Sequence, residues 1–279
     1  MYKFNLFYIF LFLLGSLFPG CKNREKEREN VGTSFKMVEV PAVITDEDEA
    51  LVYIAEHFWD NMNFSDKRFL ENKHDLNHNF YNFMDFINRV PLQTGKKSFL
   101  TFTEKLLAGD SLMIDHLRGT AEKALFDPNS PFRNEDIYIP FLEKLILSPK
   151  IDTTVREHLV YQLNLAKRNR PGERASDFGF TYRDKRQGTL YNLASEYILL
   201  AFLDPDCPAC QTAIEEMKKS PVLRKTANRL KILTIYTGVE QSRWKDWSKI
   251  LDPSWINGYD RKFSIQEGSL YDLRPTPSL

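Results

Sequence analysis

The sequence lacks an excess of charge of either sign. Its 279 residues include 38 lysines and arginines and 38 aspartates and glutamates, so the formal net charge is zero. Proteins that bind nucleic acid normally carry a clear basic excess or a basic stripe, and no such stripe occurs along this chain. We therefore expect no nucleic-acid partner.

Histidine is also scarce, which bears on metal binding. The chain has five histidines, and none follows His158. His74 and His78 have the spacing of two ligands on one helical turn, but they lie in the polar stretch NKHDLNHNF, where solvated side chains are the simpler interpretation. Because a structural zinc site needs four ligands, we expect no metal, and we expect no other cofactor.

Long apolar runs are missing as well, except at the N-terminus. Residues 1–20, MYKFNLFYIFLFLLGSLFPG, hold ~15 apolar positions, fewer than the ~20 of a membrane-spanning helix and typical of a signal peptide. Gly20-Cys21 and the charged stretch KNREKERENVGTS follow. This junction resembles a bacterial lipoprotein signal, which implies a lipid on Cys21. An uncleaved anchor or ordinary secretion is the alternative, and each of these takes the protein out of the cytosol.

After a polar linker over 21–40, the chain divides into two parts of different periodicity. Over 41–170 apolar residues recur every three or four positions, which predicts an all-α helical domain. The first helix begins near Thr45, predicted as the N-cap residue of a capping box. Its apolar face consists of Leu51, Ile54, Ala55, Phe58, Trp59 and Met62.

The stretch KRNRPGERASDFGF marks the start of a second domain, 171–279. Segments 178–182 and 189–193 flank the turn-rich RDKRQG and predict a hairpin. The continuous apolar run 197–203 is typical of a strand that is buried on both faces of a sheet. A helix from about 208 and a strand over 231–236 complete a parallel α/β unit, so the predicted fold class is α+β overall.

Cysteine is rare, with three in the chain. If Cys21 carries a lipid, one pair remains, Cys207 and Cys210 in LDPDCPAC. A disulfide across two residues closes a very short loop and stabilises little. Cys207 lies just before a helix whose first residue is Pro208, and the helix dipole there favours the thiolate that attacks disulfides. We predict a redox pair, with Cys207 as nucleophile and Cys210 as resolving cysteine.

The segments PGERASDFGF and GTLYNLASEYILLAFLDPDCPAC resemble the thioredoxin-like domains of the TlpA/ResA type. The resemblance covers 171–279. It implies that Thr276-Pro277 is the cis-proline segment, which faces the cysteines and binds the substrate backbone. The N-terminal stretch AEHFWDNMNFSD resembles a helical domain of unknown function that precedes such a domain in some Gram-negative envelope lipoproteins.

The motif departs from the cytosolic thioredoxin pattern in three places. The spacer between the cysteines is Pro208-Ala209 instead of Gly-Pro. Ala201 stands where those proteins have a buried acid, and Asp206 stands where they have a tryptophan. A carboxylate beside the nucleophile disfavours its thiolate. Asp206 and Asp204 are therefore either candidate proton acceptors or residues that form the turn.

These features together predict a membrane-anchored thiol–disulfide oxidoreductase of the Gram-negative envelope, facing the periplasm. It would reduce or isomerise disulfides of exported proteins or of redox partners that carry thiols. The resemblance also implies further strands after Leu279, so we expect a truncated domain with one unpaired edge on 197–203. The alternative is a non-enzymatic binding lipoprotein, in which the helical domain recognises a partner and the thioredoxin-like part is a degenerate scaffold.

Overall fold

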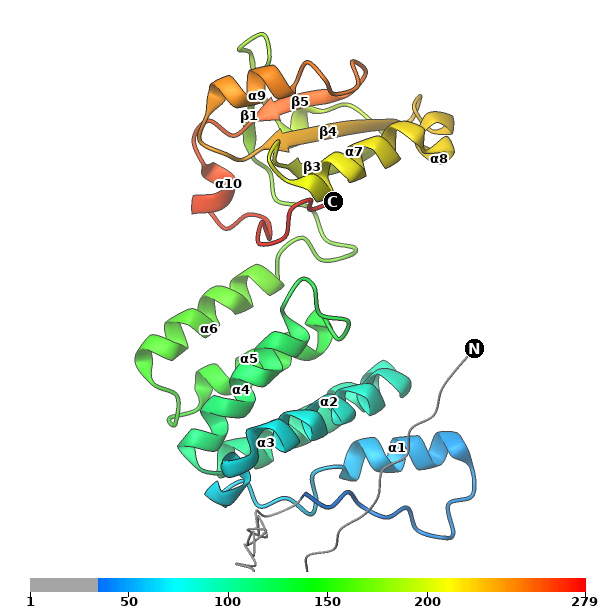
Figure 1. Cartoon of the computed structure of the whole chain (residues 1–279), viewed down its shortest axis with the longest axis vertical. Helices are drawn as coiled ribbons and strands as arrows, with labels where there is room; N and C mark the ends of the chain where they lie inside the picture. Colours follow the sequence, from blue (N-terminus) through cyan, green and yellow to red (C-terminus); the bar gives the residue numbers. More distant parts are fainter. Residues whose placement is uncertain (1–34) are drawn as a thin grey trace, which may run out of the picture.

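Helices and a mixed sheet occupy successive parts of the chain (Figure 1). The structure, a computed structural model, describes residues 35–279. The predicted signal peptide and Cys21 lie outside the described residues. Within 35–279, no helix combines the length and apolar character needed to cross a bilayer.

The first part of the described chain is helical, in agreement with the periodicity of the sequence. Asp46 caps the first helix, because its carboxylate accepts the N–H of Glu49 at 2.9 Å. The prediction of Thr45 as the cap is therefore wrong by one residue. The helices are α1 (Glu47–His57), the 3₁₀ helix η1 (Lys67–Asn72), α2 (Lys73–Arg89), α3 (Leu92–Ala108), α4 (Ser111–Leu125), α5 (Glu135–Leu147) and α6 (Thr153–Ala166).

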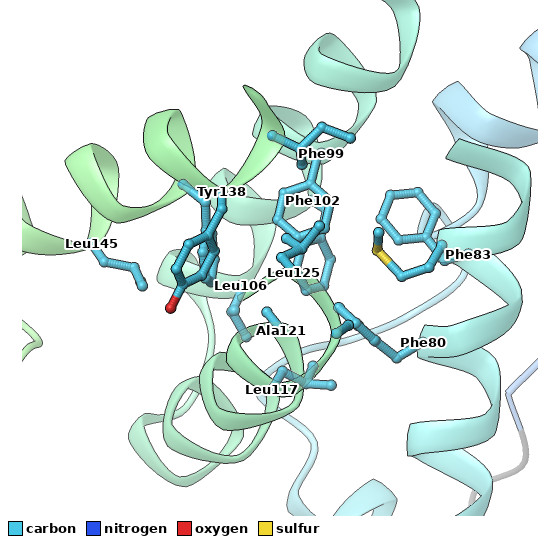
Figure 2. Close-up of a cluster of buried hydrophobic side chains, with 14 of the residues drawn as sticks. Phe80, Phe83, Phe99, Phe102, Leu106, Leu117, Ala121, Leu125, Tyr138 and Leu145 are labelled. Carbon is cyan, nitrogen blue, oxygen red and sulfur yellow. The ribbon is translucent and has the colours of Figure 1, made fainter. Parts of the chain in front are cut away.

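Aromatic side chains form the centre of the helical region (Figure 2). Phe99 of α3 lies edge-on to Phe141 of α5, with ring centroids 5.3 Å apart. Phe80 of α2 meets Phe102 of α3 in the same way at 5.7 Å. Edge-to-face pairs of this kind add to the stabilisation from burial alone. The apolar stripes of the sequence are thus the core of a helical bundle.

The second part of the chain forms one sheet among the described residues, in the order β2-β1-β5-β4-β3. β3, β4 and β5 are parallel, and β1 is antiparallel to both β2 and β5. The fold is therefore α+β, as the sequence predicts. Its elements are β1 (Gly179–Tyr182), β2 (Gln187–Thr189), η2 (Leu190–Asn192), β3 (Tyr197–Leu203), α7 (Pro208–Lys219), α8 (Pro221–Lys225), β4 (Leu230–Tyr236), α9 (Gln241–Trp247), β5 (Ile256–Tyr259) and α10 (Ser264–Glu267).

Strand β5 was not predicted, and it joins the hairpin to the parallel strands. Its sequence, INGY, has no apolar run or alternation that would indicate a strand. Gly258 fits this place because a Cβ atom there would lie 2.6 Å from Ile235 and 2.7 Å from Phe180. The absence of a side chain lets neighbouring strands pack across the glycine.

Strand β3 has both faces covered at its carboxyl end. Ala201 and Leu203 pack on α7, while Phe202 packs on the other face with Ile265 of α10. The outer edge of β3 pairs at Phe202, which exchanges two backbone hydrogen bonds of 2.8 and 3.1 Å with Ser278. The segment after α10 thus returns to β3 along the side of the sheet that faces the helical region (Figure 1).

Candidate functional site

Cys207 is the N-cap residue of α7. β3 ends at Leu203, and α7 begins at Pro208, where the missing N–H costs no hydrogen bond. Cys207 is half-buried, and its sulfur accepts the backbone N–H of Cys210 at 3.2 Å. One of the unpaired N–H groups at the start of the helix is therefore directed at this sulfur.

Cys210 lies one turn further on in a different environment. Its side chain is fully buried against Ala201, Leu203 and Ile214. Burial raises the pKa of the Cys210 thiol to about 12, and the neighbouring Cys207 adds to this shift. Both cysteines are free thiols. The pair therefore combines one accessible sulfur with one that is held as a neutral thiol at neutral pH.

The Thr276–Pro277 segment lies against the first cysteine. The peptide bond between these residues is cis, as the resemblance implies. The Cys207 thiol donates to the carbonyl oxygen of Thr276, with 3.4 Å between the sulfur and the oxygen. Ser278 follows and holds the segment on β3 through its pairing with Phe202. The two predicted halves of the site thus meet in space.

The two aspartates of the motif have different partners. The carboxylate of Asp204 accepts the backbone N–H of Asp206 at 2.8 Å and so closes the turn before the helix. The carboxylate of Asp206 pairs with the guanidinium of Arg243 at 2.6 Å. Within 35–279, neither carboxylate makes a hydrogen bond to a cysteine sulfur. The spacer residues Pro208 and Ala209 are exposed.

Arg243 was not singled out from the sequence. It lies on α9, and no local pattern connects it with Asp206. Trp244, the next residue, is 1% exposed and stacks on Tyr259, with ring centroids 5.5 Å apart. Tyr236 belongs to the same buried cluster, so it forms part of the core. Trp244 and Trp247 of α9 are both buried and are therefore packing residues.

The two histidines with helical spacing lie far along the chain from these cysteines. His74 and His78 are both exposed on α2. Across the described residues, no group of three or more histidine, cysteine, aspartate or glutamate side chains is arranged to hold a metal ion.

Both parts of the chain are similar to known proteins. Residues 20–169 match the family model described as a domain of unknown function, DUF5106. The chain belongs to the DUF5106 family. A search of curated proteins finds no match for it. The DUF5106 match ends at residue 169, after α6, and the sheet begins at Gly179.

A solved structure extends the comparison to the sheet that follows the DUF5106 region. A thioredoxin-like protein from Bacteroides caccae is 32% identical, has a TM-score of 0.80, and aligns over 88% of each chain. The C-terminal part of this DUF5106 protein therefore has a thioredoxin-like fold, the fold of thiol–disulfide oxidoreductases.

Two further solved structures align with a smaller share of the chain. The C-terminal domain of an uncharacterized protein from Bacteroides fragilis is 40% identical over 39% of this chain and 80% of that chain, with a TM-score of 0.39. A candidate protein disulfide isomerase from Bacteroides thetaiotaomicron is 24% identical over 35% of this chain and 62% of that chain, with a TM-score of 0.30.

Proposed function

We propose that the protein is a thiol–disulfide oxidoreductase of the TlpA/ResA type, with Cys207 as nucleophile and Cys210 as resolving cysteine. The observation that carries the proposal is the difference between the two sulfurs. Cys207 is accessible and accepts an N–H at the start of α7, whereas Cys210 is fully buried and its pKa is raised to about 12. An accessible sulfur meets the substrate first, and the buried one acts second.

The chemistry consists of two exchanges. The Cys207 thiolate attacks one sulfur of a substrate disulfide, so that a mixed disulfide forms as the substrate S–S bond breaks, and the departing sulfur takes up a proton. Cys210 then loses its proton and attacks Cys207, which forms the intramolecular disulfide and releases the second substrate thiol. Two electrons pass from the protein to the substrate, and a dithiol reductant returns them.

The second exchange needs an acceptor for the proton of Cys210. Asp204 is the better placed of the two predicted candidates. Its backbone N–H donates to the Cys210 sulfur across 3.5 Å and lowers the pKa of that thiol, whereas its nearby negative charge raises it. Asp206 is paired with Arg243, so we assign it no proton transfer.

We assign substrate binding to the backbone of Thr276 and Pro277. The carbonyl oxygen of Thr276 already lies 3.4 Å from the Cys207 sulfur, and Thr276 is exposed. A substrate segment that crosses Cys207 would meet this backbone. Recognition of backbone atoms suits an enzyme that acts on many sequences, because main-chain groups are common to all of them.

We place the protein in the cell envelope, attached by a lipid on Cys21 and facing the periplasm. The support is the apolar run of residues 1–20 and the Gly20-Cys21 junction, followed by a charged stretch. Substrates are then exported proteins, in which disulfides form and persist. The reductive or isomerising direction follows from the TlpA/ResA resemblance.

The test compares reduction of a protein disulfide by the full-length wild type, Cys207→Ser and Cys21→Ser in detergent. We expect Cys207→Ser to lose all activity and Cys21→Ser, the matched loss of a cysteine outside the motif, to keep the wild-type rate. Equal rates for wild type and Cys207→Ser would refute the enzymatic proposal.

A further inference from the structure

Arg274 ties the end of the chain to the helical region. Its guanidinium lies over the ring of Phe126, 3.7 Å from the centroid. One of its nitrogens also donates to the backbone carbonyl of Phe126 at 3.0 Å. Phe126 is the C-cap residue of α4 and is 2% exposed. A cation over a buried ring, with a hydrogen bond to the same residue, defines the position of the arginine closely.

The carboxylate of Asp272 also holds this guanidinium in place. It accepts two hydrogen bonds from the Arg274 guanidinium, at 2.8 and 2.7 Å, and a third from the Arg274 backbone N–H at 3.2 Å. It also faces Arg133 of the helical region at 3.4 Å. Burial opposes ionisation of Asp272, but Arg274 outweighs it, so the pKa of Asp272 lies below its ordinary value. A forked, charge-assisted pair fixes geometry better than a single contact does.

From Arg274 the chain reaches the redox site within a few residues. Thr276 follows Arg274 by two positions, and its carbonyl oxygen accepts the Cys207 thiol. The Ser278 hydroxyl donates back to the carbonyl of Asp272 at 3.2 Å, and Ser278 pairs with β3. Residues 272–278 are thus a short loop that is held at the helical region at one end and at the cysteines at the other.

Arg168 and Asn169, just after α6, also donate to the returning chain, but to backbone carbonyls of residues 268–270, which precede Asp272. A cavity of about 650 Å³ lies beside Asp272, between the end of α6 and β3. Phe126 and Asp272 line the cavity together with Leu165 of α6 and Ile198 of β3. Asp272 and Ser278 keep their other partners when Arg274 is lost, so we expect the stretch between them, which carries Thr276, to shift toward this cavity.

We propose that Arg274 is a positioning residue, through which the helical region holds the Thr276 carbonyl against the sulfur of Cys207. The inference rests on the proposed role of Cys207 as nucleophile. A hydrogen bond from the thiol stabilises the neutral form of Cys207 and disfavours the thiolate. The DUF5106 region would thereby restrain the reactivity of a cysteine in the other domain.

The test measures alkylation of Cys207 by iodoacetamide as a function of pH in the full chain, with peptide-resolved mass spectrometry. We expect Arg274→Ala to be alkylated about two- to fivefold faster than wild type at pH 7, the range that corresponds to one weak neutral hydrogen bond. Its pH profile should move to lower pH. Arg274→Lys keeps the charge but loses the paired hydrogen bonds of the guanidinium. Its alkylation rate should lie between those of wild type and Arg274→Ala.

Arg229→Ala is the matched control. Arg229 also pairs with a carboxylate, that of Glu196, and lies over a ring, that of Tyr197 at 5.4 Å, but at the opposite end of β3. The other charged groups near Cys207, namely Asp204, Asp206 and Arg243, are unchanged in every variant. We expect Arg229→Ala to keep the wild-type profile.

Two outcomes would overturn the inference: a wild-type profile in Arg274→Ala, or an equal shift in Arg229→Ala, which would indicate general loosening. If Arg274→Ala does not fold, Phe126→Leu removes the ring beneath the guanidinium and decides by the same criteria. Alkylation requires no turnover. A protein that is inactive in disulfide reduction but shows the Arg274 effect would therefore refute the proposed function and leave this inference standing.

Discussion

The Cys207 thiol donates to the carbonyl oxygen of Thr276, a residue 69 positions further along the chain, across 3.4 Å. This contact joins the start of α7 to the segment that returns to β3 after α10. It also places a backbone acceptor beside the accessible sulfur, while the second sulfur lies fully buried behind it. Much of the expected behaviour of the site follows from this arrangement.

Replacing the resolving cysteine should stop the reaction halfway. In Cys210→Ser, the mixed disulfide on Cys207 has no buried thiol to attack it, because serine cannot form a disulfide. We expect a covalent complex with a disulfide-containing protein to accumulate on non-reducing gels and to disappear on addition of dithiothreitol. Its absence in Cys210→Ser, or its presence in Cys207→Ser, would contradict the assigned roles.

The pair formed by Asp206 and Arg243 should control Cys207 through charge alone. Asp206→Asn leaves the arginine opposed only by Glu240 at 3.8 Å and favours the thiolate, whereas Arg243→Met removes the cation beside Asp206 and disfavours it. Because both side chains are partly exposed, we expect alkylation to change by only about two- to threefold, in opposite directions.

The double variant Asp206→Asn/Arg243→Met serves as the control for that pair. It removes one charge of each sign, so its alkylation rate should return to near the wild-type value. High salt should reduce the change in alkylation rate of each single variant because it screens exposed charges. A double variant that differs more from wild type than either single variant would contradict this account.

A side chain at Gly258 should destabilise the sheet. In Gly258→Ala, the new Cβ would lie within 2.7 Å of Ile235 and Phe180, and overpacking of this kind costs about 1–3 kcal/mol of unfolding free energy. Gly119→Ala is the matched control: nothing lies within 4 Å of its Cβ, and alanine favours a helix by about 0.5–1 kcal/mol. Urea unfolding measures the free energy of unfolding of both variants. An unchanged free energy in Gly258→Ala would argue against the close packing of β5.

The stability that Asp272 contributes should depend on acid pH. Its folded-state pKa lies below its ordinary value because Arg274 outweighs the effect of burial. A lowered pKa means that the contribution is complete above the unfolded pKa of about 3.9 and is lost as the pH falls through the lower folded value. The difference in unfolding free energy between wild type and Asp272→Asn should therefore be constant above about pH 5 and shrink below about pH 4. A difference that grows on acidification would reverse the sign and refute the ion pair.

Local patterns in the sequence predicted most of the fold. The apolar spacing of the first half corresponds to buried faces such as that of Phe80, Phe83 and Ile87 on α2. The apolar run of β3 and the helix after it also match the structure closely. The hairpin was shifted, since β2 ends at Thr189 and a 3₁₀ turn follows. Strand β5 was missed because INGY becomes a strand only between β1 and β4.

The site, like the fold, could be predicted from the sequence only in part. The two cysteines could be found because their chemistry depends on adjacent residues and on the start of one helix. Arg243 and Arg274 could not, because each acts on the site through a partner that is distant in sequence: Asp206 for the first and Phe126 for the second. No pattern of spacing within either segment indicates these partners.

By itself, the sequence determined the helical first half, the strand–helix unit and the position of the C-x-x-C pair at a helix start. These depend on hydrogen bonds and side-chain periodicity within a few residues. The tertiary structure decided the place of β5, the burial of Cys210, and the contact of Arg274 with the helical region. Such features require chain segments far apart in sequence to pack together, and only the folded chain brings those segments into contact.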